Sequence, residues 1–190
     1  MRTLYDGVNS LAAGIARDFP GAQMVAGYLT GQYAWTPAEW ALFPHAIHVG
    51  IVTTAAANAG DVLDVEVGDA TPEQAHDWIV MRHRAGLWRP SLYASKSIVP
   101  ALRTATRELV LGKDWDLWDA DWDGTTTPDY PRAVAKQFKN TTGYDQSAVF
   151  DDGWPHRHAP VTTPPPAKPL IAAIVVTVHY SDGTAKTVTL

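Results

Sequence analysis

Short segments rich in apolar residues recur along the chain, separated by stretches with helical spacing. Seven of them are strand-like: residues 3–8, 24–29, 47–53, 61–67, 89–94, 115–122 and 133–138. Within residues 63–67 apolar and polar side chains alternate, which is typical of a strand because successive side chains point to opposite faces. We predict a strand over each of the seven ranges.

Helix signals lie between the predicted strands. Residues 10–18 are amphipathic, with Ser10 placed as an N-cap. The segment Thr36-Pro37-Ala38-Glu39 has the order of a capping box with proline in the first turn. A further helix opens at Thr71-Pro72 and runs to about Ala85, where Gly86 stops it, and another is predicted over residues 97–111.

Alternating strands and helices indicate parallel strands with helical crossovers. Two architectures have this rhythm, an open doubly wound sheet and a (β/α) barrel. No glycine-rich phosphate loop of the open-sheet type is present. Polar residues at predicted strand ends favour the barrel, where such positions carry the chemistry: Asp6, Thr53, Glu66, Ser95 and Asp121. We predict an α/β fold with a short or irregular TIM-like (β/α) barrel.

The composition changes after Asp152, and we predict three parts. Residues 1–160 form the barrel, residues 161–169 form a stiff proline-rich linker, and residues 170–190 form a β-hairpin that turns at Ser181-Asp182-Gly183. An isolated hairpin is only marginally stable in water. The predicted hairpin therefore either docks onto another subunit or assembly, or folds back on its own domain.

Composition excludes several classes of protein. The formal net charge is −5, without a basic run, which argues against nucleic acid as a partner. The absence of cysteine removes disulfides, thiolate metal sites and cysteine nucleophiles. The longest apolar run, residues 170–178, is too short to span a membrane. The first residues run directly into a predicted strand, so we expect no signal peptide.

The segment Leu63-Asp64-Val65-Glu66 places two carboxylates on one face of a predicted strand end, about 7 Å apart along the strand. Paired carboxyl groups are what acid/base cleavage of a glycosidic bond requires. The competing interpretation is structural, because carboxylates at strand ends also cap helices and accept hydrogen bonds from loop amides.

These motifs resemble, in order, those of the glycoside hydrolase family 25 lysozymes and the related glycoside-hydrolase-like domains of bacterial and phage proteins. The resemblance covers residues 3–152. It rests on Tyr5-Asp6-Gly7-Val8, Leu63-Asp64-Val65-Glu66, Arg89-Pro90-Ser91-Leu92-Tyr93-Ala94-Ser95, Leu117-Trp118-Asp119-Ala120, Ala135-Lys136-Gln137-Phe138 and Tyr144-Asp145-Gln146-Ser147-Ala148-Val149-Phe150. The distance of 58 residues from Asp6 to Asp64 is shorter than expected for a full lysozyme of this family.

The resemblance implies a muramidase-like activity on peptidoglycan that needs no cofactor and no metal. Glu66 would be the general acid, and Asp64 would raise its pKa by repulsion, with Asp6 and Asp145 in support. We expect the substrate to contact Tyr28, Tyr93, Trp118, Asp121 and Gln137. The alternative is a non-enzymatic virion or carbohydrate-binding protein that docks on a capsid or tail through residues 170–190. Either protein would be found in a phage virion, or in the cytoplasm of the producing cell before release.

Three other patterns could indicate a binding site. The chain has eight tryptophans, which form either aromatic cores or a sugar-binding groove recruiting Trp35, Trp88, Trp118, Trp122 and Trp154. The segment Asp119-Ala120-Asp121-Trp122-Asp123-Gly124 opens like a calcium loop, but Tyr130 stands where a bidentate glutamate is needed. The seven histidines have no convincing zinc spacing, so we interpret them as surface or packing residues.

Overall fold

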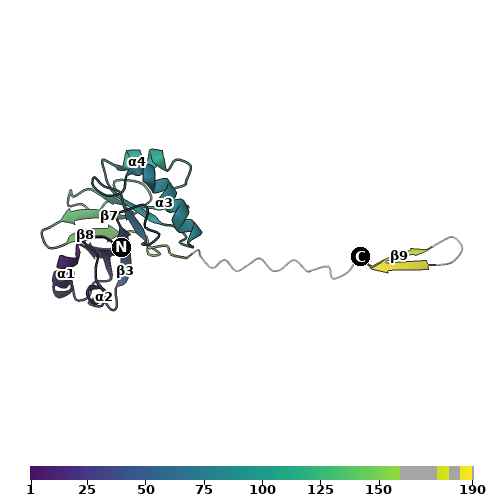
Figure 1. Ribbon diagram of the computed structural model, residues 1–190, viewed down its shortest axis with the longest axis horizontal. Coiled ribbons are helices and arrows are strands. Elements are labelled where there is room, and N and C mark those ends of the chain that lie inside the picture. The colour runs from purple at the N-terminus through teal and green to yellow at the C-terminus, as the bar shows by residue number, and fades with distance from the viewer. Residues whose placement is uncertain (159–174, 180–184, 190) are drawn as a thin grey trace. The chain divides into compact units, whose positions relative to one another are not determined.

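The computed structural model describes residues 1–158, 175–179 and 185–189 (Figure 1). The chain divides into two compact units, Met1–Ala159 and Pro160–Leu190. The first unit contains eight strands, four α-helices and one 3-10 turn: β1 (Arg2–Asp6), η1 (Asn9–Leu11), α1 (Ala12–Asp18), β2 (Met24–Tyr28), α2 (Pro37–Trp40), β3 (Ile47–Val52), β4 (Val62–Asp64), α3 (Pro72–Arg84), β5 (Ser91–Ser95), α4 (Val99–Ala105), β6 (Asp116–Ala120), β7 (Ala133–Asn140) and β8 (Asp145–Val149).

The eight strands close into a barrel in chain order, so the predicted α/β barrel is confirmed. Neighbours from β1 to β7 pair in parallel, whereas β8 is antiparallel to both β7 and β1. Two crossovers depart from a strict alternation of strand and helix, at places where we predicted no helix. In residues 1–158, β3 is joined to β4, and β6 to β7, by loops without an α-helix.

Helix boundaries follow local chemistry. Thr36 and Glu39 form the predicted capping box at the start of α2. Helix α3 ends before Gly86, whose φ of +92° favours glycine and stops the helix as predicted. Ser10 is not a cap, because the chain first makes the 3-10 turn η1 and α1 begins only at Ala12.

Helix α4 is shorter than the predicted range of residues 97–111. The hydroxyl of Thr104 donates to the carbonyl of Pro100 (3.0 Å), and that of Thr106 donates to the carbonyl of Leu102 (2.9 Å). Threonine side chains that bond back in this way compete with the helix ladder near a helix end. The helix accordingly ends at Ala105 and the chain turns toward β6.

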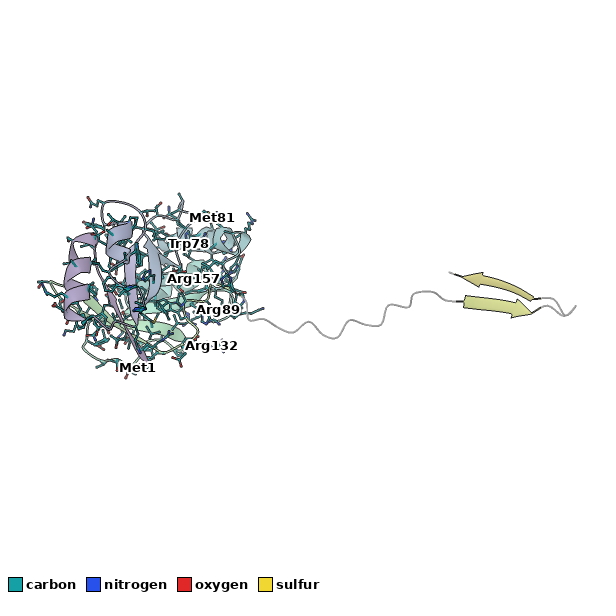
Figure 2. All side chains as sticks on the ribbon, turned by 90° about the horizontal axis from the view of Figure 1, so that it is seen from below. Met1, Trp78, Met81, Arg89, Arg132 and Arg157 are labelled. Carbon is teal, nitrogen blue, oxygen red and sulfur yellow. The ribbon has the colours of Figure 1, made fainter. Side chains whose placement is uncertain are left out.

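Three apolar clusters hold the barrel together. One fills its interior and includes Leu4, Met24, Val49, Val62, Trp118 and Val149. A second lies between the strands and helices α3 and α4, which pack side by side (Figure 1). A third packs around α1 and consists of Ala12, Ile15, Val25, Trp35 and Phe43. Trp78 of α3, labelled in Figure 2, is fully buried in the second cluster, and its indole N–H donates to the carbonyl of Ala57 (3.0 Å).

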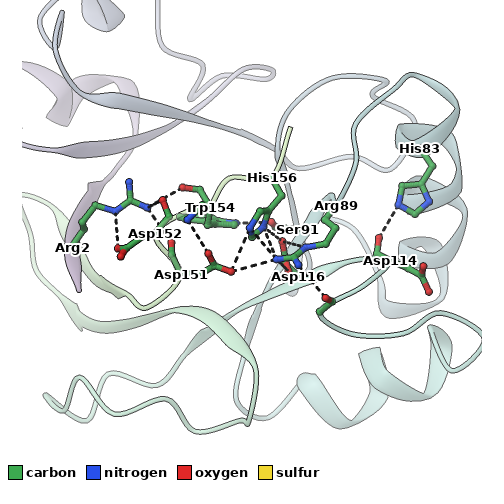
Figure 3. A network of polar contacts seen from close by, with 12 residues as sticks. Arg2, His83, Arg89, Ser91, Asp114, Asp116, Asp151, Asp152, Trp154 and His156 are labelled. Atoms are coloured by element: carbon green, nitrogen blue, oxygen red, sulfur yellow. Dashed lines mark hydrogen bonds and ion pairs between the residues drawn. The ribbon is translucent and has the colours of Figure 1, made fainter. Parts of the chain in front are cut away.

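Residues 151–158 form a strap across the barrel end where β1, β5 and β6 begin. Trp154 is buried, donates from its indole N–H to the hydroxyl of Ser91 (2.8 Å) and packs edge-on against Trp118. The guanidinium of Arg2 donates to the carbonyls of Asp151, Asp152 and Trp154 (Figure 3). The strap therefore closes this end of the barrel.

Ion pairs tie the strap to the strands. Arg89 contacts buried Asp116 at 2.9 Å, and His156 lies 2.7 Å from the same carboxylate and 3.4 Å from Asp151 (Figure 3). Arg157 pairs with Asp61 at 2.7 Å. His156 is therefore a packing residue inside a charged network, rather than a residue of an exposed loop.

In the second unit, β9 (Val175–His179) pairs antiparallel with β10 (Ala185–Thr189). The predicted linker at residues 161–169 and the turn at 181–183 lie outside the described residues. Among the described residues, none of the helices has the length and apolar content needed to cross a membrane.

Candidate functional site

Four carboxyl residues lie at one end of the barrel because of the strand directions. Asp6 is the last residue of β1 and Asp64 is the last residue of β4. Asp145 is the first residue of β8, and since β8 runs antiparallel, its first residue lies directly opposite Asp6. Glu66 follows two residues after β4. The closure of the barrel thus makes Asp6 and Asp145 neighbours.

These four residues line a common cavity of about 240 Å³. Its wall combines carboxyl, amide, phenol, indole and aliphatic groups, and none of its described lining residues is a lysine, arginine or histidine: Asp6, Gly7, Val8, Leu11, Tyr28, Ile51, Asp64, Glu66, Tyr93, Trp118, Trp122, Gln137, Asn140 and Asp145. A polar pocket with convergent titratable groups is the usual form of a binding or active site.

Asp64, the last residue of β4, is almost completely buried. Only 3% of the residue is exposed, and its Oδ2 accepts a hydrogen bond from the phenol of Tyr28 (3.2 Å). Its buried Oδ1 has no partner among the described residues. Burial, together with the charges of Glu66 and Asp69, raises the pKa of Asp64 to about 8. Asp64 therefore carries a proton at neutral pH and can donate a hydrogen bond.

Glu66 differs from its partner because the strand ends before it. We predicted a strand through residue 67, but β4 stops at Asp64 and the chain turns at Glu66, whose carbonyl accepts from the amide of Asp69 (3.1 Å). Glu66 is partly exposed at the cavity, and burial followed by the charges of Asp69 and Asp145 raises its pKa.

The effect of charge between Asp64 and Glu66 is the reverse of the one that we predicted. We predicted that Asp64 raises the pKa of Glu66, yet the charge of Glu66 raises the pKa of Asp64, whereas Asp64 is not among the groups that shift Glu66. The physical reason is burial, because Asp64 is uncharged over the range in which Glu66 ionises. Asp69, which belongs to no motif of the predicted site, contributes to both shifts.

Gln137 connects the two sides of the cavity. Its Oε1 accepts from the phenol of Tyr93 (2.8 Å) and from the indole of Trp122 (2.6 Å). Its Nε2 donates to both carboxyl oxygens of Asp6 (3.1 and 3.3 Å). These bonds fix the orientation of the Gln137 amide. Its Oε1 already accepts two hydrogen bonds, so it has no free lone pair for a further donor.

Asp6 and Asp145 share the edge opposite Asp64. Burial first, and then the charge of Asp145, raise the pKa of Asp6 well above its usual range, against the opposing hydrogen bond from Gln137. Burial raises the pKa of Asp145 to about 6. Since Asp6 is the more deeply buried of the two, it retains its proton while Asp145 ionises above about pH 6.

Four of the five expected substrate-contacting residues line the cavity: Tyr28, Tyr93, Trp118 and Gln137. Asp121 does not. Its carboxylate lies 2.7 Å from the ammonium of Lys96, and the main chain past the end of β6 carries it away from the cavity. Trp122, the next residue, lines the cavity in its place.

The remaining tryptophans proposed for a groove have other positions. Trp35 is buried and donates to the carbonyl of Gly7 (2.9 Å), and its ring lies so close to Gly27 that a side chain there would collide with it. Trp154 closes the opposite end of the barrel, and Trp88 packs edge-on against His156 near that end. Only Trp118 and Trp122 of the five reach the cavity.

The segment that resembles a calcium loop forms an ion-pair cluster. Carboxylate oxygens of Asp121, Asp123 and Asp129 lie within 4.8 Å of one another. Lys96 contacts Asp121 and Asp129 at 2.7 Å, and fully buried Lys136 contacts Asp123 at 3.1 Å and Asp129 at 2.9 Å. The ammonium groups of Lys96 and Lys136 pair with the carboxylates that a metal ion would otherwise bind.

No protein-family model matches the sequence, and no curated protein matches it. Two crystal structures of the Mycobacterium tuberculosis Tat-secreted protein Rv2525c are similar to this chain at 12% identity and a TM-score of 0.42. The complex with HEPES covers 78% of this chain and 95% of the other, and the complex with L-tartrate covers 80% and 96%. A likeness at this level carries no inference about function.

Proposed function

We propose that this protein is a glycoside hydrolase that acts on peptidoglycan, at the bond between N-acetylmuramic acid and N-acetylglucosamine. The observation that carries the proposal is the convergence of Asp6, Asp64, Glu66 and Asp145 on one cavity with aromatic and amide neighbours. The barrel would then be a short, irregular member of the TIM-like class, in which loops replace the helices after β3 and β6.

Glu66 is the general acid of the proposed reaction. It lies at the cavity wall with partial exposure, so a substrate oxygen can reach it, and its raised pKa favours the protonated form that an acid needs. Its proton passes to the leaving oxygen as the glycosidic bond breaks and positive charge develops on the sugar ring.

Asp64 supports this step as a neutral group. With a pKa of about 8 it adds no negative charge beside Glu66 at neutral pH, and its unpaired Oδ1 can donate to an acetamido carbonyl of the sugar or to water. Tyr28 holds the other oxygen in place.

Asp145 is the ionised carboxylate of the site above about pH 6. A carboxylate facing the ring stabilises the positive transition state, and either attacks the sugar or activates the water that does. Asp6, which retains its proton, lies opposite Asp145 and is held in place by the side-chain amide of Gln137.

Peptidoglycan as the substrate rests on the resemblance of residues 3–152 to the family 25 lysozymes and their phage relatives. The geometry itself supports a neutral or cationic sugar chain, because the described lining residues offer carboxyl, hydroxyl and amide groups without a basic side chain to pair with an anion. We infer a phage-associated role from the same resemblance.

Release of dye from labelled peptidoglycan tests the proposal. Glu66→Gln is expected to lower the rate by at least about 100-fold, because the amide cannot donate a proton to the leaving group. Asp64→Asn is expected to lower it less than Asp64→Leu, because an amide still donates a hydrogen bond. Glu108→Gln, at an exposed residue outside the cavity, is the control and should match the wild type. A wild-type protein that releases no dye from several cell walls would refute the enzyme.

A non-enzymatic carbohydrate-binding protein of a virion is the second candidate. One observation favours it: residues 160–190 form a unit of their own whose described part is a two-stranded sheet. Two strands alone are marginal in water, and such a sheet gains stability by docking onto another protein. In that case the cavity would bind a glycan without turnover.

A further inference from the structure

The loop between β6 and β7 places a large aromatic side chain at the cavity and in solvent at the same time. Trp122 follows the last residue of β6 by two positions, lines the cavity, and is 53% exposed. The indoles of Trp118 and Trp154, by contrast, are buried. A single exposed apolar side chain is ordinary on a protein surface, but an exposed indole at the wall of a polar cavity is placed to contact a ligand.

The ring of Trp122 is held from its inner edge. Its Nε1 donates to Gln137 Oε1 at 2.6 Å, and the same amide donates to Asp6. Backbone bonds fix both sides of the residue: the amide of Asp121 donates to the carbonyl of Gln137 (3.1 Å), and that of Gly124 donates to the carbonyl of Phe138 (3.1 Å). The indole edge is thus anchored, while about half of the residue (53%) stays exposed to solvent.

Ion pairs hold the two neighbours of Trp122 in sequence. Asp121 is bound by Lys96 at 2.7 Å, and Asp123 by buried Lys136 at 3.1 Å. Asp129, farther along the same loop, contacts both lysines. Lys136 lies on β7, one residue before Gln137, so one strand anchors the loop through a cation and the indole through an amide.

An aromatic ring fixed before binding loses little conformational entropy when a ligand arrives. A flat indole face presents apolar and π-electron surface, which suits the C–H face of a pyranose ring, while the neighbouring carboxyl and amide groups suit its hydroxyl and acetamido groups. The anchored indole of Trp122 is therefore suited to receive a sugar ring.

We propose that Trp122 is a preorganised platform on which one N-acetylhexosamine ring stacks, and that Lys96 and Lys136 position it through Asp121, Asp123 and Asp129. The inference deepens the proposed function and rests on it for the identity of the sugar. It assigns the segment resembling a calcium loop a role in sugar binding rather than in metal binding.

Titration calorimetry with an N-acetylglucosamine tetramer, alongside dye release from peptidoglycan, tests the platform. Trp122→Ala is expected to weaken tetramer binding about tenfold or more, and Trp122→Phe by less, because phenylalanine keeps a ring but loses the bond to Gln137. Leu42→Ala removes another exposed apolar side chain away from the cavity and should bind like the wild type.

The positioning role is tested through Lys96. Lys96→Met is expected to raise the Kd for the tetramer and the KM for peptidoglycan about threefold to tenfold while leaving kcat unchanged, and Lys96→Arg is expected to restore both, because an arginine can still pair with Asp121. A general loss of folding would instead lower kcat and binding in both variants.

The outcomes separate the platform from the proposed enzyme. Tetramer binding that depends on Trp122 without any dye release would leave the platform standing and overturn the hydrolase. Dye release with tetramer binding and KM unchanged in Trp122→Ala would overturn the platform and leave the hydrolase standing. A wild-type protein that binds neither the tetramer nor peptidoglycan would overturn the platform.

Discussion

Asp64 and Glu66 stand two positions apart in the chain, yet they meet different surroundings. Asp64 is the end of β4 and is enclosed by the barrel wall and Tyr28, whereas Glu66 lies past the strand where water reaches it. A difference in burial of this kind separates the pKa values of two carboxyl groups, so that Asp64 keeps its proton while Glu66 can give its proton up to a substrate.

The proton on Asp64 makes folding stability depend on pH. The folded-state pKa of about 8 lies above the ordinary value of 3.8, so between about pH 4 and pH 8 the unfolded chain loses this proton while the folded protein keeps it. The contribution of Asp64 to stability is therefore fully present below pH 4 and is lost as pH rises toward 8, at up to about 1.4 kcal/mol per pH unit.

Asp64→Asn removes this titration and keeps a neutral side chain of the same shape. The free energy of unfolding of the variant, relative to wild type, is expected to rise from pH 5 to pH 8 and then to level off. Urea unfolding of both proteins at each pH measures the difference. Parallel stability curves for the two proteins would show that Asp64 is ionised in the folded state.

Single residues also show where prediction from sequence ends. The resemblance pointed to Asp6, Asp64, Glu66 and Asp145, and all four line the cavity. It could not identify the burial of Asp64, because Tyr28 comes from β2, 36 residues earlier in the chain. Nor did it separate Asp121 from Trp122, since the chain leaves the regular strand at Ala120 and alternation no longer applies.

At the scale of elements, the strap of residues 151–158 is a segment whose sequence carries no strand or helix signal. It nevertheless closes the barrel with Trp154 and pairs charges with β5 and β6. Trp154 also contacts Trp118, which lines the cavity at the other end of the barrel interior. We therefore expect the strap to stabilise the barrel far more than its lack of regular structure suggests.

Trp154→Ala is expected to lower the free energy of unfolding by about 3–5 kcal/mol, because it leaves a large cavity in the barrel interior and an unpaired Ser91 hydroxyl. Trp122→Ala removes the same atoms from a half-exposed position and should cost much less. Urea unfolding compares the two variants. Equal losses would mean that the strap packs only loosely on the barrel.

The seven predicted strands match β1 to β7, and the capping box at Thr36 and the signal at Thr71-Pro72 gave the starts of α2 and α3. The antiparallel direction of β8 is a property of barrel closure rather than of any local pattern. It matters for the site, because only that direction brings Asp145 opposite Asp6. The crossovers after β3 and β6 carry no helix, in agreement with the sequence, which has no helix signal between residues 53 and 61 or between 122 and 133.

At the scale of the whole molecule, the described residues up to 158 contain everything that the proposed site needs. The closed barrel, the cavity, the loop with Trp122 and the strap all belong to the unit Met1–Ala159. The pair β9–β10 belongs to the other unit. A hydrolase therefore works without residues 161–190, whereas a virion component needs them to dock onto its assembly.

A chain ending at residue 160 is expected to fold with the melting temperature of the barrel in the full protein and to keep its activity on peptidoglycan, because every ion pair of the strap is retained. A chain ending at residue 150 is the matched comparison and should fail to fold, since it lacks Trp154, His156 and Arg157. Calorimetry and dye release measure both chains. If the longer chain folds but glycan binding and dye release are lost, residues 161–190 complete the site and the autonomous hydrolase is wrong. If it loses only the ability to join an assembly formed by the full protein, those residues dock the barrel while the cavity works alone.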